Sequence, residues 1–499
     1  MVDQSTRSHD RPKARLPRGF QDSTGKMLVI HEQLIGKLAE VYASYGFERL
    51  TTPCVEFADA LGKFLPDQNR PNEGVFSFKD DDDQWLVLRY DLTAPLARYV
   101  AENYDSLAFP YRRFQTGPVF RDEKPGPGRF REFIQFDADT VGTSSMAADA
   151  EFCMLVADAL EALGLPRGDY MVKVNNRKVL NGILELIGVP GGPEGDARRL
   201  NVLRAMDKLD RLGVEGVGQL LGKGRKDESG DFTQGAGLAS KGIDRVLGFL
   251  NAQGADRDSV CKSLEQLVKG SAVGEEGAAE LMQIDAALAA AGFGVDRVRI
   301  DPAVVRGLAY YTGPVFEAEL TFQINDDDGR PIRFGSVGGG GRYDDLVERF
   351  LGKKVPATGV SIGVSRLAAA LQMRGLLAGK ADIGPVVVLV LDRDRLTGYQ
   401  AMVSEMRACG IRAELYLGEG GMRAQLRYAD KRAAPVVVIE GEDERKKGEV
   451  TLKDMALGTQ LSSEIKSRDE WAKGGLSQVS VKRENLTSVV REVLARQMR

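Results

Sequence analysis

The feature that most constrains the fold of this chain is a pair of strand-like segments separated by a loop rich in glycine and proline. Residues 133–141 alternate apolar and polar side chains, and residues 111–121 form a further strand candidate. Alternation is the period of a β-strand that buries one face. The intervening residues 122–131 include the sequence Pro-Gly-Pro-Gly, which favours a loop. Together the three segments predict a long antiparallel hairpin.

The length of the chain predicts several domains. A chain of 499 residues is too long for one hydrophobic core, so we expect about two to four domains. Hydrophobic residues make up 43%, as is typical of a soluble globular protein. No apolar run is long enough to span a membrane, and residues 1–15 lack the apolar core of a secretory signal. The cysteines lie far apart, which favours reduced thiols and a cytoplasmic location: Cys54, Cys153, Cys261 and Cys409.

The charge balance is nearly neutral. The net charge is −4, from 68 basic and 72 acidic residues. This balance gives a nucleic-acid partner no support, but it leaves room for local basic patches. The histidines are His9 and His31, and neither lies among other polar groups that could share in chemistry. Mechanisms that need a histidine base, and histidine-rich metal sites, are therefore disfavoured.

Periodicity divides the chain into three regions. Apolar residues recur at helical spacing over residues 30–45, and Gly46 is expected to end that helix. Strands are predicted at residues 47–52 and 85–93, and again at 315–322 and 332–337 around a polar turn. Residues 165–295 have helical periodicity and few strand signals, which indicates a mostly helical insertion.

The last region alternates strands and helices. Strands are predicted at residues 385–391, 411–417 and 435–439, with helices near 399–408 and 425–431 between them. Alternation of this kind predicts a small domain with a largely parallel sheet. Residues 375–384 are interpreted as the linker that precedes it.

Residues 88–93 form the first group with chemical potential. On a strand, Arg89, Asp91 and Thr93 would share one face, and a carboxylate beside a hydroxyl suits an ammonium group. Taken alone, the pattern is more often that of an exposed strand face.

The predicted hairpin carries the second group. Arginines with an aromatic neighbour can clamp a nucleotide, because guanidinium binds phosphate and a ring offers a stacking face. On the return strand, Gln135, Asp137 and Asp139 share one face. The alternative is a solvated hairpin laced with salt bridges. The clamp residues would be Arg121, Glu123, Arg129, Arg131 and Phe133.

Three glycine-containing segments complete the set. Residues 305–313 hold Arg306 beside Tyr310 and Tyr311, although paired tyrosines are more often core residues. The four glycines of residues 338–341 follow the second strand of a hairpin and would let a ligand approach the backbone. Residues 359–367 indicate a strand entering a helix, with Arg366 in the first turn, where an anion nearby would offset the unfavourable dipole.

The order of these segments resembles that of class II aminoacyl-tRNA synthetases. Residues 30–53, 120–133 and 359–366 resemble the three motifs of that class. Residues 88–93, 306–311 and 339–344 resemble motifs of histidyl-tRNA synthetases within it. The resemblance covers roughly residues 15–460, and the Arg-Gly-Leu-x-Tyr-Tyr-Thr-Gly segment is its most specific piece.

The resemblance implies an α+β fold with a divided catalytic domain. Residues 1–165 and 296–376 would form that domain around an antiparallel six-stranded sheet, interrupted by the helical insertion of residues 166–295. Residues 384–499 would form a C-terminal α/β domain that binds the anticodon. A homodimer built on residues 30–53 is also implied.

The implied reaction is ligation of histidine to tRNA. Histidine attacks the α-phosphorus of ATP to give histidyl-adenylate and pyrophosphate, and a ribose hydroxyl of tRNA(His) then takes the histidyl group. Mg²⁺ is expected to accompany the phosphates. A carboxylate is already a nucleophile at neutral pH, so the first step needs positioning and charge stabilisation and no base.

The resemblance also implies roles for individual residues. Catalysis would fall to Arg306 and Arg121, and no side chain is assigned to a metal. Histidine would be bound by Asp91, Thr93, Gln135, Asp139, Tyr310 and Tyr311. ATP would be bound by Arg121, Glu123, Arg131, Phe133 and Arg366. The tRNA would meet Arg129 and a helical stripe of Arg423, Arg427 and Lys431, although such stripes are usually only solvated faces.

Two departures from the family pattern stand out. Ala309 replaces the aspartate of Arg-Gly-Leu-Asp-Tyr-Tyr, and Gly126 replaces the glutamine of the hairpin loop. The main alternative is a regulatory subunit for ATP phosphoribosyltransferase, which usually lacks the C-terminal domain and the ATP-binding arginines. An oxidoreductase would need a dinucleotide fingerprint, which this sequence does not contain.

Overall fold

The computed structural model places the chain in two compact units, Met1–Leu377 and Ala378–Arg499. It describes residues 13–61, 74–125, 130–189, 191, 195–206, 208–226, 231–252, 254–304, 311–325, 331–332, 334–376, 383–457 and 477–497. None of the helices in these ranges is both long and apolar enough to cross a bilayer.

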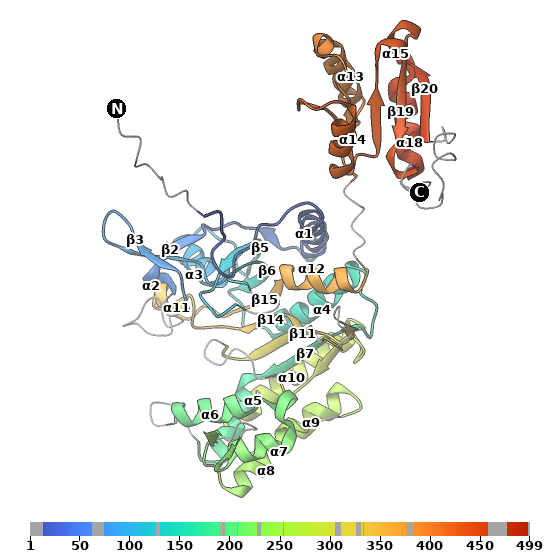
Figure 1. The fold of residues 1–499 in the computed structure, drawn as a ribbon. Coiled ribbons are helices and arrows are strands. Elements are labelled where there is room, and N and C mark those ends of the chain that lie inside the picture. Colours follow the sequence, from blue (N-terminus) through green and yellow to red (C-terminus); the bar gives the residue numbers. More distant parts are fainter. Residues whose placement is uncertain are drawn as a thin grey trace, which may run out of the picture. The chain divides into compact units, whose positions relative to one another are not determined.

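A large sheet organises the first unit (Figure 1). Its order is β1-β5-β6-β15-β14-β11-β7-β10. The strands are β1 (Glu48–Arg49), β5 (Tyr111–Phe120), β6 (Glu132–Val141), β7 (Tyr170–Asn176), β10 (Val298–Ile300), β11 (Pro314–Leu320), β14 (Gly335–Arg342) and β15 (Ala357–Gly363). The prediction of six antiparallel strands was wrong for the whole sheet, which is eight-stranded and mixed. The difference lies at its edges, because β1 and β10 pair in parallel with β5 and β7.

The predicted hairpin is confirmed as β5 and β6. They pair without interruption from Tyr111 opposite Val141 to Phe120 opposite Glu132. The pairing puts Phe114, Phe136 and Ala138 on the buried face of the sheet, where they join its core. The alternation seen in the sequence therefore separates a core face from a polar face.

Helices α1 (Lys26–Ser44), α4 (Met146–Ala162) and α12 (Val364–Met373) cover the core face, and α10 (Ala272–Ala290) packs against α4, β7 and β11 on the same side. Ile30, Leu34 and Leu38 of α1 are fully buried, at the spacing that predicted this helix. Gly46 follows with φ 82°, a left-handed conformation that ends the helix where predicted. These helices leave the other face of the sheet free for polar side chains.

A small sheet of order β2-β4-β3 lies beside this framework. The strand predicted over residues 85–93 is shorter than expected. The strand ends at Leu88, and a helix begins at Thr93. Oδ1 of Asp91 accepts the backbone N–H groups of Thr93 (3.1 Å) and Ala94 (2.9 Å), which favours a helix start. Arg89, Asp91 and Thr93 therefore do not share one strand face. The elements of this region are β2 (Val55–Phe57), α2 (Ala58–Leu61), β3 (Ser77–Lys79), β4 (Trp85–Leu88), α3 (Thr93–Glu102) and α11 (Glu348–Leu351).

Residues 166–295, predicted as a mostly helical insertion, contain one element of the large sheet. Strand β7 lies in this range and pairs with β11 and β10. The prediction was therefore wrong at its N-terminal end, because β7 passes directly into a helix and offers no turn residues between them. The other elements are α5 (Arg177–Leu186), α6 (Asp196–Met206), α7 (Leu209–Leu221), β8 (Gly224–Lys226), β9 (Phe232–Gln234), α8 (Ser240–Leu250), α9 (Arg257–Val268) and α10 (Ala272–Ala290).

The predicted hairpin partner at residues 332–337 is displaced. The strand that pairs with β11 is β14, Gly335–Arg342, while β12 (Ile324–Asn325) and β13 (Pro331–Ile332) form a separate short ladder. Gly338 to Gly341 thus lie inside a strand and do not follow one.

The second unit holds a five-stranded sheet of order β17-β16-β18-β19-β20. The three predicted strands pair in parallel, but β19 and β20 add antiparallel pairs, so the sheet is mixed. Its elements are β16 (Val386–Val388), α13 (Leu396–Ala408), β17 (Ala413–Leu415), α14 (Met422–Lys431), β18 (Val436–Ile439), α15 (Glu442–Lys447), β19 (Glu449–Asp454), β20 (Gln478–Lys482) and α18 (Leu486–Gln497), with 3₁₀ turns at Arg393–Arg395 and Arg483–Asn485.

Candidate active site

The polar face of the large sheet is lined by acidic and amide side chains over a floor of glycines. Directly paired residues share a face, so Gln115, Asp137, Ser361, Gly339 and Glu317 form one row across five strands. A Cβ added to Gly339 would meet only a carbonyl oxygen, at 3.3 Å, and the space above it is otherwise open. The row therefore contains an uncovered floor at Gly339, between Ser361 and Glu317, on which a small ligand could lie.

Asp139 is held by two partners in the next row. Its carboxylate lies 2.9 Å from Nη2 of Arg113, and the hydroxyl of Tyr343 donates to its other oxygen. Arg113 is completely buried and also donates to the carbonyl of Leu92 (2.8 Å). A Cβ on Gly359 would lie 2.1 Å from Oδ1 of Asp139, so only glycine lets this carboxylate lie across the neighbouring strand. Asp139 is thus fixed in orientation.

Gln135 and Asp137 meet at Ser361. The Gln135 amide donates to Oγ of Ser361 (2.5 Å), and a hydrogen bond joins Ser361 to Asp137. Burial raises the pKa of Asp137 to about 8, and the charge of Asp139 raises it further, against the influence of Arg113. Burial also raises the pKa of Tyr311, followed by the charges of Asp137, Asp139 and Asp91. Asp91 and Tyr311 are therefore part of the same site.

Arg121 lies at the end of the hairpin between two aromatic rings. Its guanidinium carbon is 4.4 Å from the ring centre of Tyr90 and 5.1 Å from that of Phe133. The Tyr90 hydroxyl donates to Glu123 (3.1 Å), which links the same group to the loop. Phe133 shares its face with Gln135, so an aromatic ring and a cation border the polar row. This arrangement suits a base and a phosphate.

Two predicted nucleotide ligands have protein partners. Arg131 pairs with Asp122 (3.0 Å) and donates to the carbonyl of Glu123 (3.0 Å). Arg366 lies in the first turn of α12, as predicted, and donates to the carbonyl of Phe334. Both contacts bring cations to the border of the site, and Arg131 also braces the loop.

The residues on either side of the segment that contains Arg306 are anchored by Asn175 and Arg177, where β7 passes into α5. Nδ2 of Asn175, which is buried, donates to the carbonyls of Pro302 (3.1 Å) and Val304 (2.9 Å). The backbone N–H of Arg177 donates to the carbonyl of Gly313 (2.8 Å). Arg306, Tyr310, Ala309, Gly126 and Arg129 lie outside the described residues.

Sequence reasoning missed Arg113, Tyr343 and Ser361. The hairpin register places Arg113 opposite Asp139, so counting back from the loop would have found the ion pair. Tyr343 lies in the run Gly-Gly-Gly-Gly-Arg-Tyr-Asp, but its role depends on a strand far away in the sequence. Arg342 in the same run contacts Asp149 and the carbonyl of Thr143 (2.9 Å), which supports the fold.

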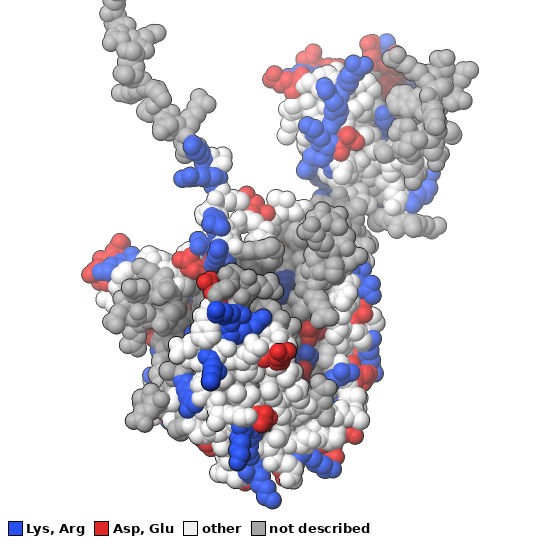
Figure 2. All heavy atoms as spheres, turned by 60° about the horizontal axis from the view of Figure 1, so that its bottom comes forward, with Lys and Arg blue, Asp and Glu red and all other residues white. Residues whose placement is uncertain are grey.

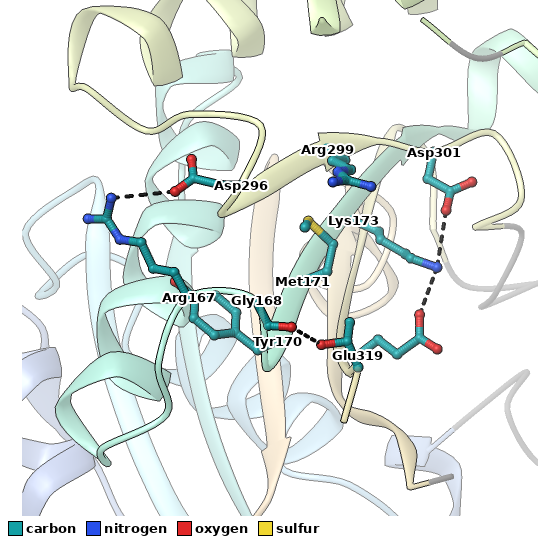
Figure 3. Close-up of a pocket in the computed structure, with 10 residues that line it drawn as sticks. Arg167, Gly168, Tyr170, Met171, Lys173, Asp296, Arg299, Asp301 and Glu319 are labelled. Carbon is teal, nitrogen blue, oxygen red and sulfur yellow. Dashed lines mark hydrogen bonds and ion pairs between the residues drawn. The ribbon is translucent and has the colours of Figure 1, made fainter. Parts of the chain in front are cut away.

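A hollow of about 560 Å³ lies on the far edge of this sheet, at β7 and β10 (Figure 3). Its central cation, Lys173, lies between Asp301 (3.2 Å) and Glu319 (2.7 Å). Because Lys173 is already paired with both carboxylates, it offers no free cation to a ligand.

In the second unit, the predicted basic stripe is exposed on α14. Arg423, Arg427 and Lys431 are solvent-exposed, and none of them has an ion-pair partner among the described residues. The adjacent Arg432 is paired with Glu414 at 3.0 Å. Figure 2 shows Lys and Arg side chains gathered on the side of this unit where Figure 1 places α13 and α14. The stripe is therefore available to an anionic partner.

Comparison with known families agrees with this architecture. A family model described as histidyl-tRNA synthetase matches residues 19–367, and one described as anticodon binding domain matches residues 385–492. The first unit thus contains a catalytic domain of the class II aminoacyl-tRNA synthetases, and the second is an anticodon-binding domain.

Curated relatives match over nearly the whole chain. The histidine–tRNA ligase of Brucella ovis is 59% identical over 493 residues, covering 98% of both chains. That of Methylocella silvestris is 58% identical over 492 residues, covering 97% of this chain and 98% of the relative. This chain belongs to the histidyl-tRNA synthetase family.

Solved structures share the fold. A histidyl-tRNA synthetase from Nostoc sp. PCC 7120 is 27% identical, with a TM-score of 0.70, over 97% of this chain and 100% of that chain. A Bacillus halodurans structure titled as an ATP phosphoribosyltransferase regulatory subunit/histidyl-tRNA synthetase is 21% identical with a TM-score of 0.63, and covers 84% of this chain and 97% of that one. At that identity it shows the fold alone.

Proposed function

We propose that this synthetase activates histidine with ATP, forming histidyl-adenylate and pyrophosphate, and then transfers histidine to the 3′ end of tRNA(His). The observation that carries the proposal is the near full-length similarity to histidine–tRNA ligases, including the anticodon-binding domain. The polar row on the sheet supplies a site of matching chemistry.

The adenylation step is one of positioning. The histidine carboxylate attacks the α-phosphorus, the new bond joins its oxygen to phosphorus, and pyrophosphate leaves with the bonding electrons. Arg306 and Arg121 stabilise the negative charge that builds on the phosphate, with Arg306 next to the reacting carboxylate. No proton has to be removed from the nucleophile, which agrees with a site border of arginines and aromatic rings.

ATP binds at the hairpin end of the site. Its adenine stacks on Phe133, and its phosphates meet Arg121 and Arg366, with Glu123 and Arg131 ordering the loop. Mg²⁺ enters as part of the substrate, bound to the phosphates of ATP.

Histidine binds on the polar row. Its α-ammonium group, a triple donor, is taken by Asp91, Thr93 and Gln135. Its imidazole, which needs both a donor and an acceptor, is recognised by Asp139 with Tyr310 and Tyr311. In support, Asp91 and Tyr311 lie near enough to the aspartates of β6 to affect their ionisation or be affected by it.

The tRNA and the second subunit use other surfaces. Arg129 in the hairpin loop contacts the acceptor end, while Arg423, Arg427 and Lys431 on α14 contact phosphates near the anticodon. The homodimer forms around residues 30–53, where β1 is a two-residue edge strand with both side chains exposed. Sedimentation at micromolar concentration is expected to show a dimer, and a monomer would contradict this assignment.

Pyrophosphate exchange tests the activity itself. Exchange of labelled pyrophosphate into ATP should require histidine, and aminoacylation should then require tRNA(His). A regulatory subunit would bind histidine without exchange, so absence of exchange with intact histidine binding would refute the proposed activity.

A further inference from the structure

Two aspartates on β6 differ in how completely the protein satisfies them. Asp137 and Asp139 are each 2% exposed and lie two residues apart on the same face. Asp139 has the Arg113 guanidinium at 2.9 Å and the Tyr343 hydroxyl as a donor. Asp137 has one neutral hydrogen bond, to Ser361, and no ion pair within the described ranges. Only one of the two carboxyl groups is therefore held in place by a cation of the protein.

The hydrogen bonds of Ser361 explain why only one carboxyl oxygen of Asp137 has a donor. A serine hydroxyl has one proton to donate. Because the Gln135 amide donates to this oxygen, the hydroxyl proton is directed to Asp137. The other carboxyl oxygen, Oδ1, is buried, and no described residue donates to it. Arg113 contacts Asp139 and the Leu92 carbonyl through Nη2, and its buried Nε and Nη1 form no hydrogen bond with Oδ1 or with any other described atom.

The surroundings of Oδ1 favour a ligand that supplies a hydrogen-bond donor. A buried acceptor without a donor is costly, and such groups are usually explained by something that binds there. Oε1 of Gln135, on the same face, also has no hydrogen-bond partner among the described atoms. The charges that act on Asp137 are those of Asp139 and Asp91 on the acidic side and those of Arg113 and Arg89 on the basic side. Acceptors and negative charge thus exceed donors at this point of the row.

We propose that Asp137 is a further specificity-determining residue, whose Oδ1 accepts the ring N–H of the bound histidine. The inference rests on the proposed function and adds Asp137 to the residues assigned to the imidazole. Asp139, held by Arg113 and Tyr343, borders the ring from the neighbouring row. The open space over Gly339 leaves room for a five-membered ring over β14, beside the Asp139 carboxylate that lies across Gly359.

The proton balance of this contact is consistent. Burial, with the charge of Asp139 next, raises the pKa of Asp137 to about 8, so the empty site holds one proton on this carboxyl near neutral pH. When neutral histidine binds, that proton passes to the ring, and a carboxylate then faces an imidazolium N–H. The pair keeps the same net charge, so binding adds no unpaired charge to the buried row.

The test measures the affinity of each protein variant for histidine and for two histidine analogues. Calorimetric binding, without ATP or tRNA, compares histidine with β-(thiazol-4-yl)alanine, which has no ring N–H, and with 1,2,4-triazolylalanine, which keeps one. The wild-type protein is expected to bind histidine about 10- to 100-fold more tightly than the thiazole. In Asp137→Ala this preference should fall at least about fivefold, because the acceptor is lost on the protein side, and it should fall less in Asp137→Asn, which keeps a neutral carbonyl acceptor. The triazole keeps the ring N–H but is too weak a base to take the Asp137 proton, so it should bind the wild-type protein between histidine and the thiazole and lose its advantage over the thiazole in Asp137→Ala.

Asp296→Asn is the matched control, since Asp296 is an exposed aspartate at the far edge of the sheet. It should keep the wild-type preference. If both Asp137 variants weaken histidine and thiazole by the same factor, Asp137 serves the fold alone and the proposal fails. A wild-type preference below about threefold would also overturn it, while histidine-dependent pyrophosphate exchange would still report separately on the activity.

Discussion

The two sheets of this protein differ in what covers their faces. The large sheet is apolar under α1, α4 and α12 and polar on the opposite face, where the candidate site lies. The sheet of the second unit is apolar on both faces: Val386, Val388 and Val436 join one core, and Val387, Leu389 and Val437 join another. The first sheet can therefore hold a ligand on its face, whereas the second must present its contacts on helices such as α14.

The largest effect is expected from removing the cation that is assigned to the transition state. This tests whether the chemistry belongs to the first unit. Arg306→Ala should slow adenylate formation by about 10²–10³-fold while changing histidine affinity much less, because charge builds on the phosphate mainly in the transition state. Pre-steady-state adenylate formation measures this. Arg299→Ala, an exposed arginine on β10, is the control. A rate for Arg306→Ala within about threefold of wild type would remove this residue from the mechanism.

A smaller effect is expected from filling the glycine floor. In Gly359→Ala the added methyl would lie 2.1 Å from Oδ1 of Asp139, so that carboxylate must move away from Arg113 and Tyr343. Overpacking of this kind costs about 1–3 kcal/mol, and KM for histidine should rise about ten- to a hundredfold. Gly398→Ala meets no atom within 4 Å and should change nothing. Equal KM values for the two variants would show that the floor does not position Asp139.

The basic stripe on α14 tests whether the second unit presents its contacts on a helix. Replacing Arg423, Arg427 and Lys431 together by alanine should raise KM for tRNA about tenfold and leave pyrophosphate exchange unchanged, since phosphate contacts supply much of the affinity. The slope of log affinity against log salt should become shallower by about three, one for each lost contact. Arg432→Ala, which removes a cation already paired with Glu414, is the control. An unchanged salt slope in the triple variant would make the stripe a solvated face.

The smallest expected effect concerns stability of the empty site. Between the ordinary carboxyl pKa and about 8, folded Asp137 keeps a proton that the unfolded chain loses. The free energy of unfolding therefore falls as pH rises, by at most about 1.4 kcal/mol per pH unit. Asp137→Asn removes this term, so from pH 5 to pH 8 its Tm should gain a few degrees relative to wild type, and the difference should level off above that range. Thermal melts without ligands measure it, and parallel curves would argue against a protonated Asp137.

Local patterns predicted the parts of the fold that each need only a few neighbouring residues. The β5–β6 hairpin, the α1 helix with its end at Gly46, and the strand entering α12 at Arg366 are confirmed. In the second unit, short apolar runs at β16 and β18 were enough, because strands buried on both faces are continuously apolar.

What the sequence did not predict depends on pairing at long range. The edge strands β1 and β10 are two and three residues long, too short to show a period. β7 lies in a helical region, and only its partner β11, far along the chain, identifies it as part of the large sheet. In the site, Asp137 was seen to share a face with Asp139, but only Arg113, Tyr343 and Ser361 reveal that the two carboxyl groups differ.

The two anchors at Asn175 and Arg177 have a mechanical consequence. Strand β7 ends at Asn176 and helix α5 begins at Arg177, so the anchors of Val304 and Gly313 lie on one continuous piece of backbone. They are separated by only about 7 Å of strand. A force that tilts α5 would turn both ends of the intervening segment together, without pulling them apart. Load on the helical region would thus turn Val304 and Gly313 together, with the distance between them unchanged.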